Sequence, residues 1–162
     1  MRGVRYMFLV MVASLALSAC SKEDNNDEAE QAAIAEQAAK DEVLILDYLS
    51  KITMPAVEHS SGIYYSVIQE GSGENPTANS TVTVKYEGWL LSTKEVFDAT
   101  EEDKTAAFSL NSVIKGWQIG VPLIKTGGKI RLYIPSGLAY GPSASSGIPA
   151  NSVLIFEVEL VS

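Results

Sequence analysis

Apolar and polar residues alternate along several stretches in the second half of the chain. Residues 81–91 place Val82, Val84 and Tyr86 on one face, with polar residues between them. The alternation recurs in residues 129–134 and 153–161, and shorter β-rich runs occupy residues 62–69, 94–97 and 106–110. A period of two turns successive side chains to opposite faces, as in a half-buried strand. The pattern therefore predicts an antiparallel sheet within residues 62–162.

A long segment before the sheet has the spacing of a helix. Residues 29–52 are rich in Ala, Glu, Gln and Leu, which favour helix, and contain no Gly or Pro. Ile45, Leu49 and Ile52 form an apolar stripe at i, i+4 and i+7, which Leu44 and Tyr48 widen. Such a helix could pack on the sheet domain, pair with a second copy of the chain, or act as a spacer. We predict that residues 29–61 form a helical extension and linker.

A second, short helix is expected within the sheet domain. Residues 113–121 can be capped by Asn111 or Ser112, and Pro122 lies just beyond their end. The Gly- and Pro-containing segment 136–151 reads as a long loop. Strands interrupted late by one helix indicate an α+β fold rather than a parallel βαβ layout.

The first residues of the chain have the pattern of an export signal. Arg2 and Arg5 precede an apolar run over residues 6–19, which is short for a membrane-spanning helix. The run ends in Leu17-Ser18-Ala19-Cys20, which resembles a bacterial lipobox, and Cys20 is the one Cys of the chain. The resemblance implies that residues 1–19 are a lipoprotein signal peptide and that lipidated Cys20 binds the membrane. The alternative is a plain signal peptide whose Cys is incidental. The expected location is the bacterial cell envelope, at the outer membrane, on its periplasmic or its surface-exposed face.

Charge narrows the choice of partners. Residues 20–28 are polar and acidic, which suits a disordered tether and also resembles the surface-export signal of some bacterial lipoproteins. The formal net charge of the chain is −8, so it repels phosphate backbones and we expect no nucleic-acid partner. A single His and no Cys/His cluster argue against a zinc site, and we expect neither a metal nor another cofactor.

The familiar catalytic constellations are missing from the sequence. There is no Gly-x-Ser-x-Gly, Walker loop or dinucleotide fingerprint, and no His follows His59. Asp98 and the acidic residues 101–103 could supply paired carboxylates for work on a sugar, although a solvated acidic loop is the simpler interpretation. What remains is a series of aromatic and aliphatic residues that lie beside glycines or at the ends of the predicted elements. Taken singly, each is more often a core residue, Trp117 included.

Several motifs, taken in order, carry a family resemblance. They are Val84-Lys85-Tyr86-Glu87-Gly88, Val96-Phe97-Asp98, Phe108-Ser109-Leu110, Val113-Ile114-Lys115-Gly116-Trp117, Ile134-Pro135-Ser136-Gly137-Leu138-Ala139-Tyr140-Gly141, Ile148-Pro149-Ala150-Asn151-Ser152 and Leu154-Ile155-Phe156-Glu157-Val158-Glu159-Leu160. From about Gly62 to the C-terminus the chain resembles FKBP-type peptidyl-prolyl cis–trans isomerases. The resemblance implies a twisted antiparallel sheet wrapped around one short helix, and polypeptide clients that contain proline.

The resemblance also implies a proline pocket. Its lining would be Tyr86, Phe97, Val113, Ile114, Trp117, Tyr140 and Phe156, with Phe108 and Ile148 as further substrate contacts. Trp117 would form the floor and Asp98 the polar group at the rim. The Ile114 N–H and the Tyr140 hydroxyl would hydrogen-bond the carbonyl groups of the substrate. Macrolide inhibitors would bind the same pocket.

The chain departs from the family pattern at several positions. Gly137 replaces a usual acidic residue, Ala150 a usual Pro and Ala106 an aromatic of some relatives, and residues 142–147 carry no charge or aromatic ring. Lys104 is the candidate partner for Asp98, although Lys cannot form the bidentate fork of Arg. These departures affect substrate preference, macrolide affinity and the level of activity.

Three functions compete on this sequence. The first is a lipid-anchored isomerase that assists the folding of exported proteins. The second is a module that binds proline-containing segments, or a chaperone, with little turnover. The third is a structural surface lipoprotein with a vestigial pocket. Suitable residues at every lining position, Asp98 and Tyr140 among them, favour the enzyme.

Overall fold

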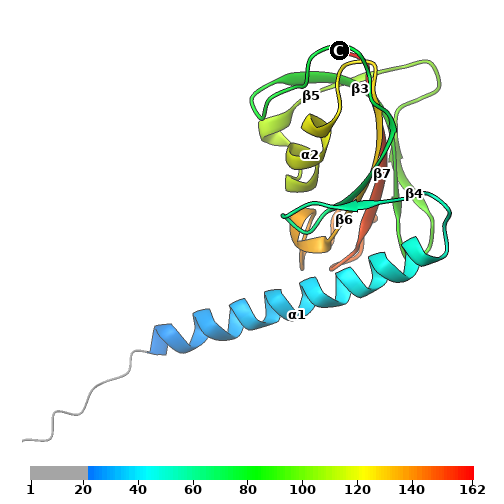
Figure 1. Cartoon of the computed structure of the whole chain (residues 1–162). Helices are drawn as coiled ribbons and strands as arrows, with labels where there is room; N and C mark the ends of the chain where they lie inside the picture. Colours follow the sequence, from blue (N-terminus) through cyan, green and yellow to red (C-terminus); the bar gives the residue numbers. More distant parts are fainter. Residues whose placement is uncertain (1–21) are drawn as a thin grey trace, which may run out of the picture.

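The computed structural model describes residues 22–162, so the signal peptide and the lipidated Cys20 expected from the sequence lie outside the described residues. A long helix precedes the strands (Figure 1). The elements run in the order α1 (Lys22–Ser50), β1 (Val57–Glu58), β2 (Tyr64–Gln69), β3 (Thr81–Leu90), β4 (Val96–Ala99), β5 (Ala106–Ser109), η1 (Leu110–Ser112), α2 (Lys115–Gly120), η2 (Val121–Leu123), β6 (Lys129–Ile134), η3 (Ser136–Leu138) and β7 (Leu154–Leu160), where η marks a 3-10 turn.

The strands form a single antiparallel sheet among the described residues. Its order is β1-β2-β6-β7-β3-β4, and β5 pairs with β3 beyond that path. The sheet curves around α2, which lies in its concave side (Figure 1). The predicted α+β fold, an antiparallel sheet wrapped around a short helix after a helical segment, is confirmed. Every strand expected from the alternation is present, with ends that shift by a few residues.

The main core fills the space between the concave face of the sheet and α2. Trp117 and Val121 meet the alternate residues Leu132, Phe156 and Val158 there. Helix α2 approaches β6 closely because two of its buried residues, Gly116 and Gly120, are glycines that face this strand. A Cβ at Gly116 would lie 2.5 Å from Ile134 Cγ2, and a Cβ at Gly120 would lie 2.5 Å from Leu132 Cδ2. Only glycine allows α2 to approach the strand so closely.

The predicted start and cap of the short helix were wrong. Helix α2 begins at Lys115 rather than at residue 113, and Ile114 is its N-cap, without a side-chain hydrogen bond. Asn111 and Ser112 belong to η1, where the Ser112 hydroxyl donates to Asn111 Oδ1 at 2.8 Å. Burial of Trp117 holds a helix this short in place, so it forms without the cap that an exposed helix needs.

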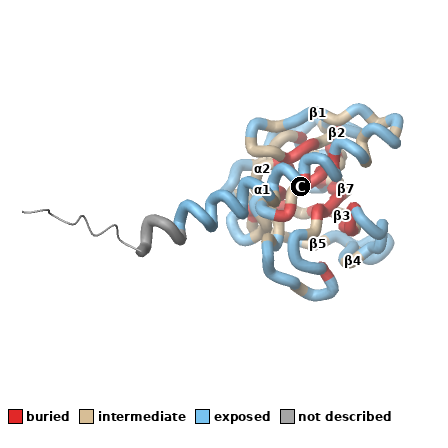
Figure 2. Tube along the Cα trace, turned by 90° about the horizontal axis from the view of Figure 1, so that it is seen from below, coloured by how far each residue is buried: buried red, intermediate tan, exposed pale blue. Residues whose placement is uncertain are grey.

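Helix α1 is part of the same folded unit. Ile45, Tyr48 and Leu49 pack on the convex face of the sheet, in a second core cluster that contains Tyr133 and Ile155. The C-terminal half of α1 therefore takes the first of the roles considered above, packing on the domain. Residues 27–36 of the helix project away from the sheet and are exposed (Figures 1 and 2).

Two expectations about this segment were wrong. The helix extends back to Lys22, through residues that were expected to form a disordered tether, because no Gly or Pro interrupts them. Leu44 does not widen the packed stripe, since it is 47 % exposed. Ile34, Val43 and Leu46 are also exposed, so pairing through residues 29–52 remains an expectation. Within residues 22–162, no helix combines the length and apolar character needed to cross a bilayer.

Candidate active site

Trp117 lies at the centre of a group of aromatic rings. The rings of Tyr86, Phe108 and Phe156 meet it edge-on, with centroids 5.3, 5.6 and 5.3 Å away. Phe97 meets Phe156 edge-on at 5.5 Å. Edge-to-face pairs at these distances are favourable beyond the area they bury. We call these five residues the aromatic wall.

The strand register assembles this wall from distant parts of the chain. Tyr86 pairs with Val158, and Gly88 pairs with Phe156 two residues along, so Tyr86 and Phe156 share the concave face. Strand β4 pairs with β3 and brings Phe97 to the same edge, and β5 brings Phe108. The sheet thus gathers three rings around the Trp117 side chain of α2, which is 4 % exposed, and places Phe97 against one of them.

Gly88 makes room for two of these rings. A Cβ at this position would lie 2.6 Å from Phe156 Cε1 and 2.9 Å from Phe97 Cζ. A side chain there would displace the rings, since interiors have little room for extra atoms. Gly88 is therefore a site residue that the sequence analysis missed. Its signal was a glycine inside an otherwise regular strand, which often marks close approach of another group.

The polar end of the site is a tyrosine–aspartate pair. The Tyr86 hydroxyl donates to Asp98 Oδ2 at 2.6 Å. Burial raises the pKa of Tyr86, and the hydrogen bond to Asp98 raises it further, so the phenol keeps its proton. Lys104 pairs with Glu101 at 2.5 Å, and no ion pair to Asp98 occurs among residues 27–162. The phenol, and not Lys104, therefore fixes the Asp98 carboxylate.

Two groups expected to bind the substrate have free hydrogen-bonding capacity. The Ile114 carbonyl accepts from the Trp117 N–H at 3.0 Å, whereas the Ile114 N–H donates to no acceptor within residues 27–162. The Tyr140 hydroxyl likewise makes no hydrogen bond in this part of the chain, and its side chain is 40 % exposed. Val113 and Ile114 pack on the main core, and Ile148 is buried within it. Val113, Ile114 and Ile148 thus pack in the same core as Trp117 and Phe156, and Tyr140 is the most exposed of the predicted contacts.

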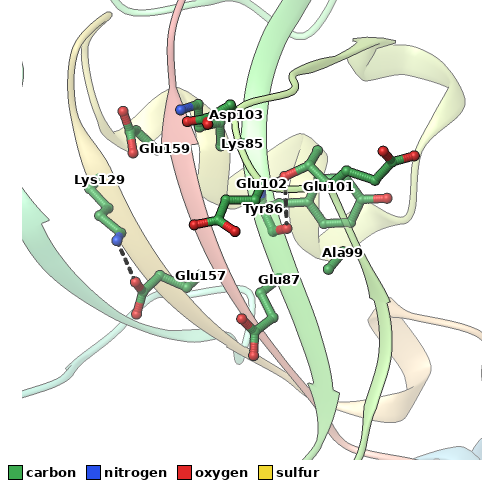
Figure 3. A pocket seen from close by; sticks show the side chains of 11 residues that line it. Lys85, Tyr86, Glu87, Ala99, Glu101, Glu102, Asp103, Lys129, Glu157 and Glu159 are labelled. Atoms are coloured by element: carbon green, nitrogen blue, oxygen red, sulfur yellow. Dashed lines mark hydrogen bonds and ion pairs between the residues drawn. The ribbon is translucent and has the colours of Figure 1, made fainter.

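A second, charged cleft of about 320 Å³ lies on the outward face of the sheet (Figure 3). Carboxylates of β3, β7 and the loop after β4 line it, and Lys129 pairs with Glu157 at 2.6 Å. Burial alone would raise the pKa of Glu157, but hydrogen bonds from Lys129 and Arg131 outweigh it and hold the pKa below its usual value. No cluster of three His, Cys, Asp or Glu side chains suited to a metal occurs among the described residues. This cleft shares only Tyr86 with the aromatic wall.

Comparison with known proteins identifies the family. The family model described as FKBP-type peptidyl-prolyl cis-trans isomerase matches residues 72–161, which is more than half of the chain. The chain belongs to the FKBP-type peptidyl-prolyl cis-trans isomerase family. The resemblance inferred from the motifs is therefore confirmed, and the FKBP-type domain holds every residue of the aromatic wall.

Named relatives extend the match beyond the family model. FkpA of Escherichia coli, an FKBP-type peptidyl-prolyl cis-trans isomerase, is 40 % identical over 133 residues, which are 81 % of this chain and 49 % of FkpA. The isomerase Mip of Coxiella burnetii is 44 % identical over 105 residues, 64 % of this chain and 45 % of Mip. The chain spans about half the length of these curated relatives.

Solved structures agree with the family. The crystal structure of FkpA from Escherichia coli matches with a TM-score of 0.67 and 38 % identity, over 86 % of this chain and 67 % of that one. A peptidyl-prolyl cis-trans isomerase from Pseudomonas syringae matches with a TM-score of 0.67 and 31 % identity, over 79 % and 93 %. The family model ends one residue before the C-terminus and covers only residues 72–161. Both structural matches cover 79 % or more of this chain, so they must include residues before residue 72.

Proposed function

We propose that this FKBP-type chain isomerises X-Pro bonds of polypeptides at the aromatic wall. The observation that carries the proposal is Trp117 surrounded by edge-on rings, together with an Ile114 N–H and a Tyr140 hydroxyl that make no hydrogen bond to residues 27–162. A proline ring suits an apolar aromatic surface, and the two donors suit the carbonyl groups on either side of it. Membership of the FKBP-type family and the similarity to FkpA support the same activity.

The proposed mechanism needs no nucleophile. Rotation about a peptide bond faces a barrier of about 18–20 kcal/mol, which amide resonance creates. Water bound to the amide carbonyl stabilises the planar, charge-separated form. Contact with the aromatic wall would replace that water and favour the twisted amide, whose C–N bond is closer to single. A site that fits the twisted amide better than either planar isomer accelerates the reaction by differential binding, tenfold for each 1.36 kcal/mol.

Tyr140→Phe should separate catalysis from stability. Because the hydroxyl has no partner within residues 27–162, its loss should change the free energy of unfolding by less than about 0.5 kcal/mol. Loss of one hydrogen bond to the substrate should lower kcat/KM for a short X-Pro peptide about tenfold. The assay follows isomerisation of the peptide, with denaturant unfolding measured in parallel.

Tyr48→Phe is the matched control, because Tyr48 lies in the cluster on the convex face. It should leave kcat/KM unchanged. Parallel loss of activity and melting temperature in Tyr140→Phe would contradict the role of its hydroxyl. A well-folded wild type with no isomerase activity would contradict the proposed function itself.

Binding with little turnover is the second candidate. An open groove of about 1010 Å³ lies between the projecting half of α1 and the loop after β6, and apolar residues such as Ile34, Leu138 and Pro142 line it. It lies beside the loop that carries Tyr140 and could hold the chain on one side of a bound proline. An inactive wild type that still binds the X-Pro peptide would favour this candidate.

We propose that the protein acts on exported proteins from a membrane anchor at Cys20. The lipobox-like Leu17-Ser18-Ala19-Cys20, at the end of an apolar run, supports this proposal. In cells fed labelled palmitate, the chain should carry label and sediment with the outer membrane. Cys20→Ser should abolish both results, whereas Ser21→Ala should change neither. Export of an unlabelled chain would instead support the plain signal peptide.

A further inference from the structure

Helix α1 carries a fully buried carboxylate, and apolar packing does not account for its burial. Asp41 is 0 % exposed and makes no ion pair among residues 27–162. Its Oδ2 accepts from the Ser136 N–H at 2.7 Å and from the Ser136 hydroxyl at 2.6 Å. Its Oδ1 accepts from Gln37 Nε2 at 2.8 Å. A carboxylate is retained in such a place only when several donors surround it.

Ser136 in turn holds the turn that precedes Tyr140. Its carbonyl accepts from the Ala139 N–H at 2.9 Å and from the Gly141 N–H at 2.8 Å. Tyr140 lies in the chain between the two residues that donate these bonds, and its own side chain is 40 % exposed. The position of the Tyr140 hydroxyl therefore depends on the backbone around Ser136. Figure 1 shows this orange segment after β6 lying against α1.

We propose that Asp41 is a positioning residue for Tyr140, through which the docked helix α1 sets the geometry of the proline site. The inference rests on the proposed isomerase function. Helix α1 contributes no ring to the aromatic wall, and the two hydrogen bonds of Asp41 link it to the turn that carries Tyr140. Residues 95 positions apart in the sequence are thus joined by two hydrogen bonds to one oxygen atom.

The test combines Asp41→Ala with Tyr140→Phe in the full chain. Asp41→Ala alone should lower kcat/KM for an X-Pro peptide about tenfold, since misplacement by a fraction of an ångström is enough for such a loss. In the Tyr140→Phe background the same change should cost less than twofold, because the group that it positions is already missing. Asp41→Asn, which keeps an oxygen acceptor, should restore most of the activity.

Hydrogen exchange gives a readout that does not depend on turnover. In Asp41→Ala, protection of the Ser136, Ala139 and Gly141 amides should fall while that of the β7 amides is kept. The matched control is Asp47→Ala, because Asp47 lies on the same helix but pairs with Lys51 at the surface. It should change neither the exchange nor the activity.

The outcomes distinguish this inference from the proposed function. If the wild type isomerises the peptide and Asp41→Ala alters neither kcat/KM nor exchange at Ser136–Gly141, the positioning role is wrong and the activity stands. Equal losses from Asp41→Ala in both backgrounds would also overturn it, since they would show a general effect. If the wild type is inactive, the exchange data alone decide whether Asp41 holds the turn. If Asp41→Ala does not fold, Ser136→Ala replaces it, because that variant loses only the hydroxyl bond.

Discussion

Replacing Trp117 by alanine is expected to lower the free energy of unfolding by about 3–5 kcal/mol, the usual cost of removing a buried aromatic side chain. The indole is 4 % exposed, and three rings meet it edge-on. The side chains around the indole belong to several strands and to α2, so the cavity that the substitution leaves cannot close easily. Denaturant unfolding, followed by circular dichroism, measures the change.

The same variant should lose more activity than its stability explains. At temperatures below its unfolding midpoint, the folded Trp117→Ala variant keeps Asp98 and Tyr140. It lacks the floor of the pocket, on which the proline ring would lie. We expect kcat/KM to fall at least tenfold at temperatures where the variant is fully folded, which corresponds to about 1.4 kcal/mol. Trp89→Ala is the control, because Trp89 packs on the convex face. It should lose stability and keep its activity per folded molecule. Full activity in folded Trp117→Ala would contradict the proposed site.

The strands could be predicted because one face of the sheet packs on α2 in a regular way. In residues 129–134, Ile130, Leu132 and Ile134 face α2, and the alternation alone was enough to give both ends of β6. The edge strand β1 was missed, since two exposed residues carry no pattern. The start of α2 was misplaced because a signal for a cap is local, whereas this helix is held by distant packing.

The site residues were predicted from the family motifs more than from the pattern of apolar and polar positions. Trp117 and Phe156 look like ordinary core residues in the sequence, and only the family resemblance assigns them to a pocket. Asp41 could not have been predicted at all. A charged residue in a polar helix is normally solvated, and the donors that bury this one belong to Ser136, far along the chain. Gly88 depends in the same way on rings contributed by other strands.

The variant Ile45→Ala tests whether α1 is a separate extension or a part of the folded sheet domain. Ile45 is 0 % exposed and packs with Tyr133 and Ile155, whose neighbours Leu132 and Phe156 belong to the main core. The change should lower the free energy of unfolding by about 2–5 kcal/mol, as for other buried aliphatic truncations. Because strands β6 and β7 carry both core clusters, the loss should appear in one cooperative transition of helix and sheet.

Val43→Ala is the control for this prediction, since Val43 lies on the same helix and is 66 % exposed. It should change the free energy of unfolding by less than about 0.5 kcal/mol. Two probes distinguish the alternatives: the helical signal at 222 nm and the fluorescence of Trp117 and Trp89, with the wild type alongside. If the helical signal of Ile45→Ala falls first and the tryptophan midpoint stays at the wild-type value, α1 is a separate spacer. If both signals shift together, the folded domain begins within α1 rather than at residue 62, and the helix that carries Asp41 is as much a part of it as the sheet.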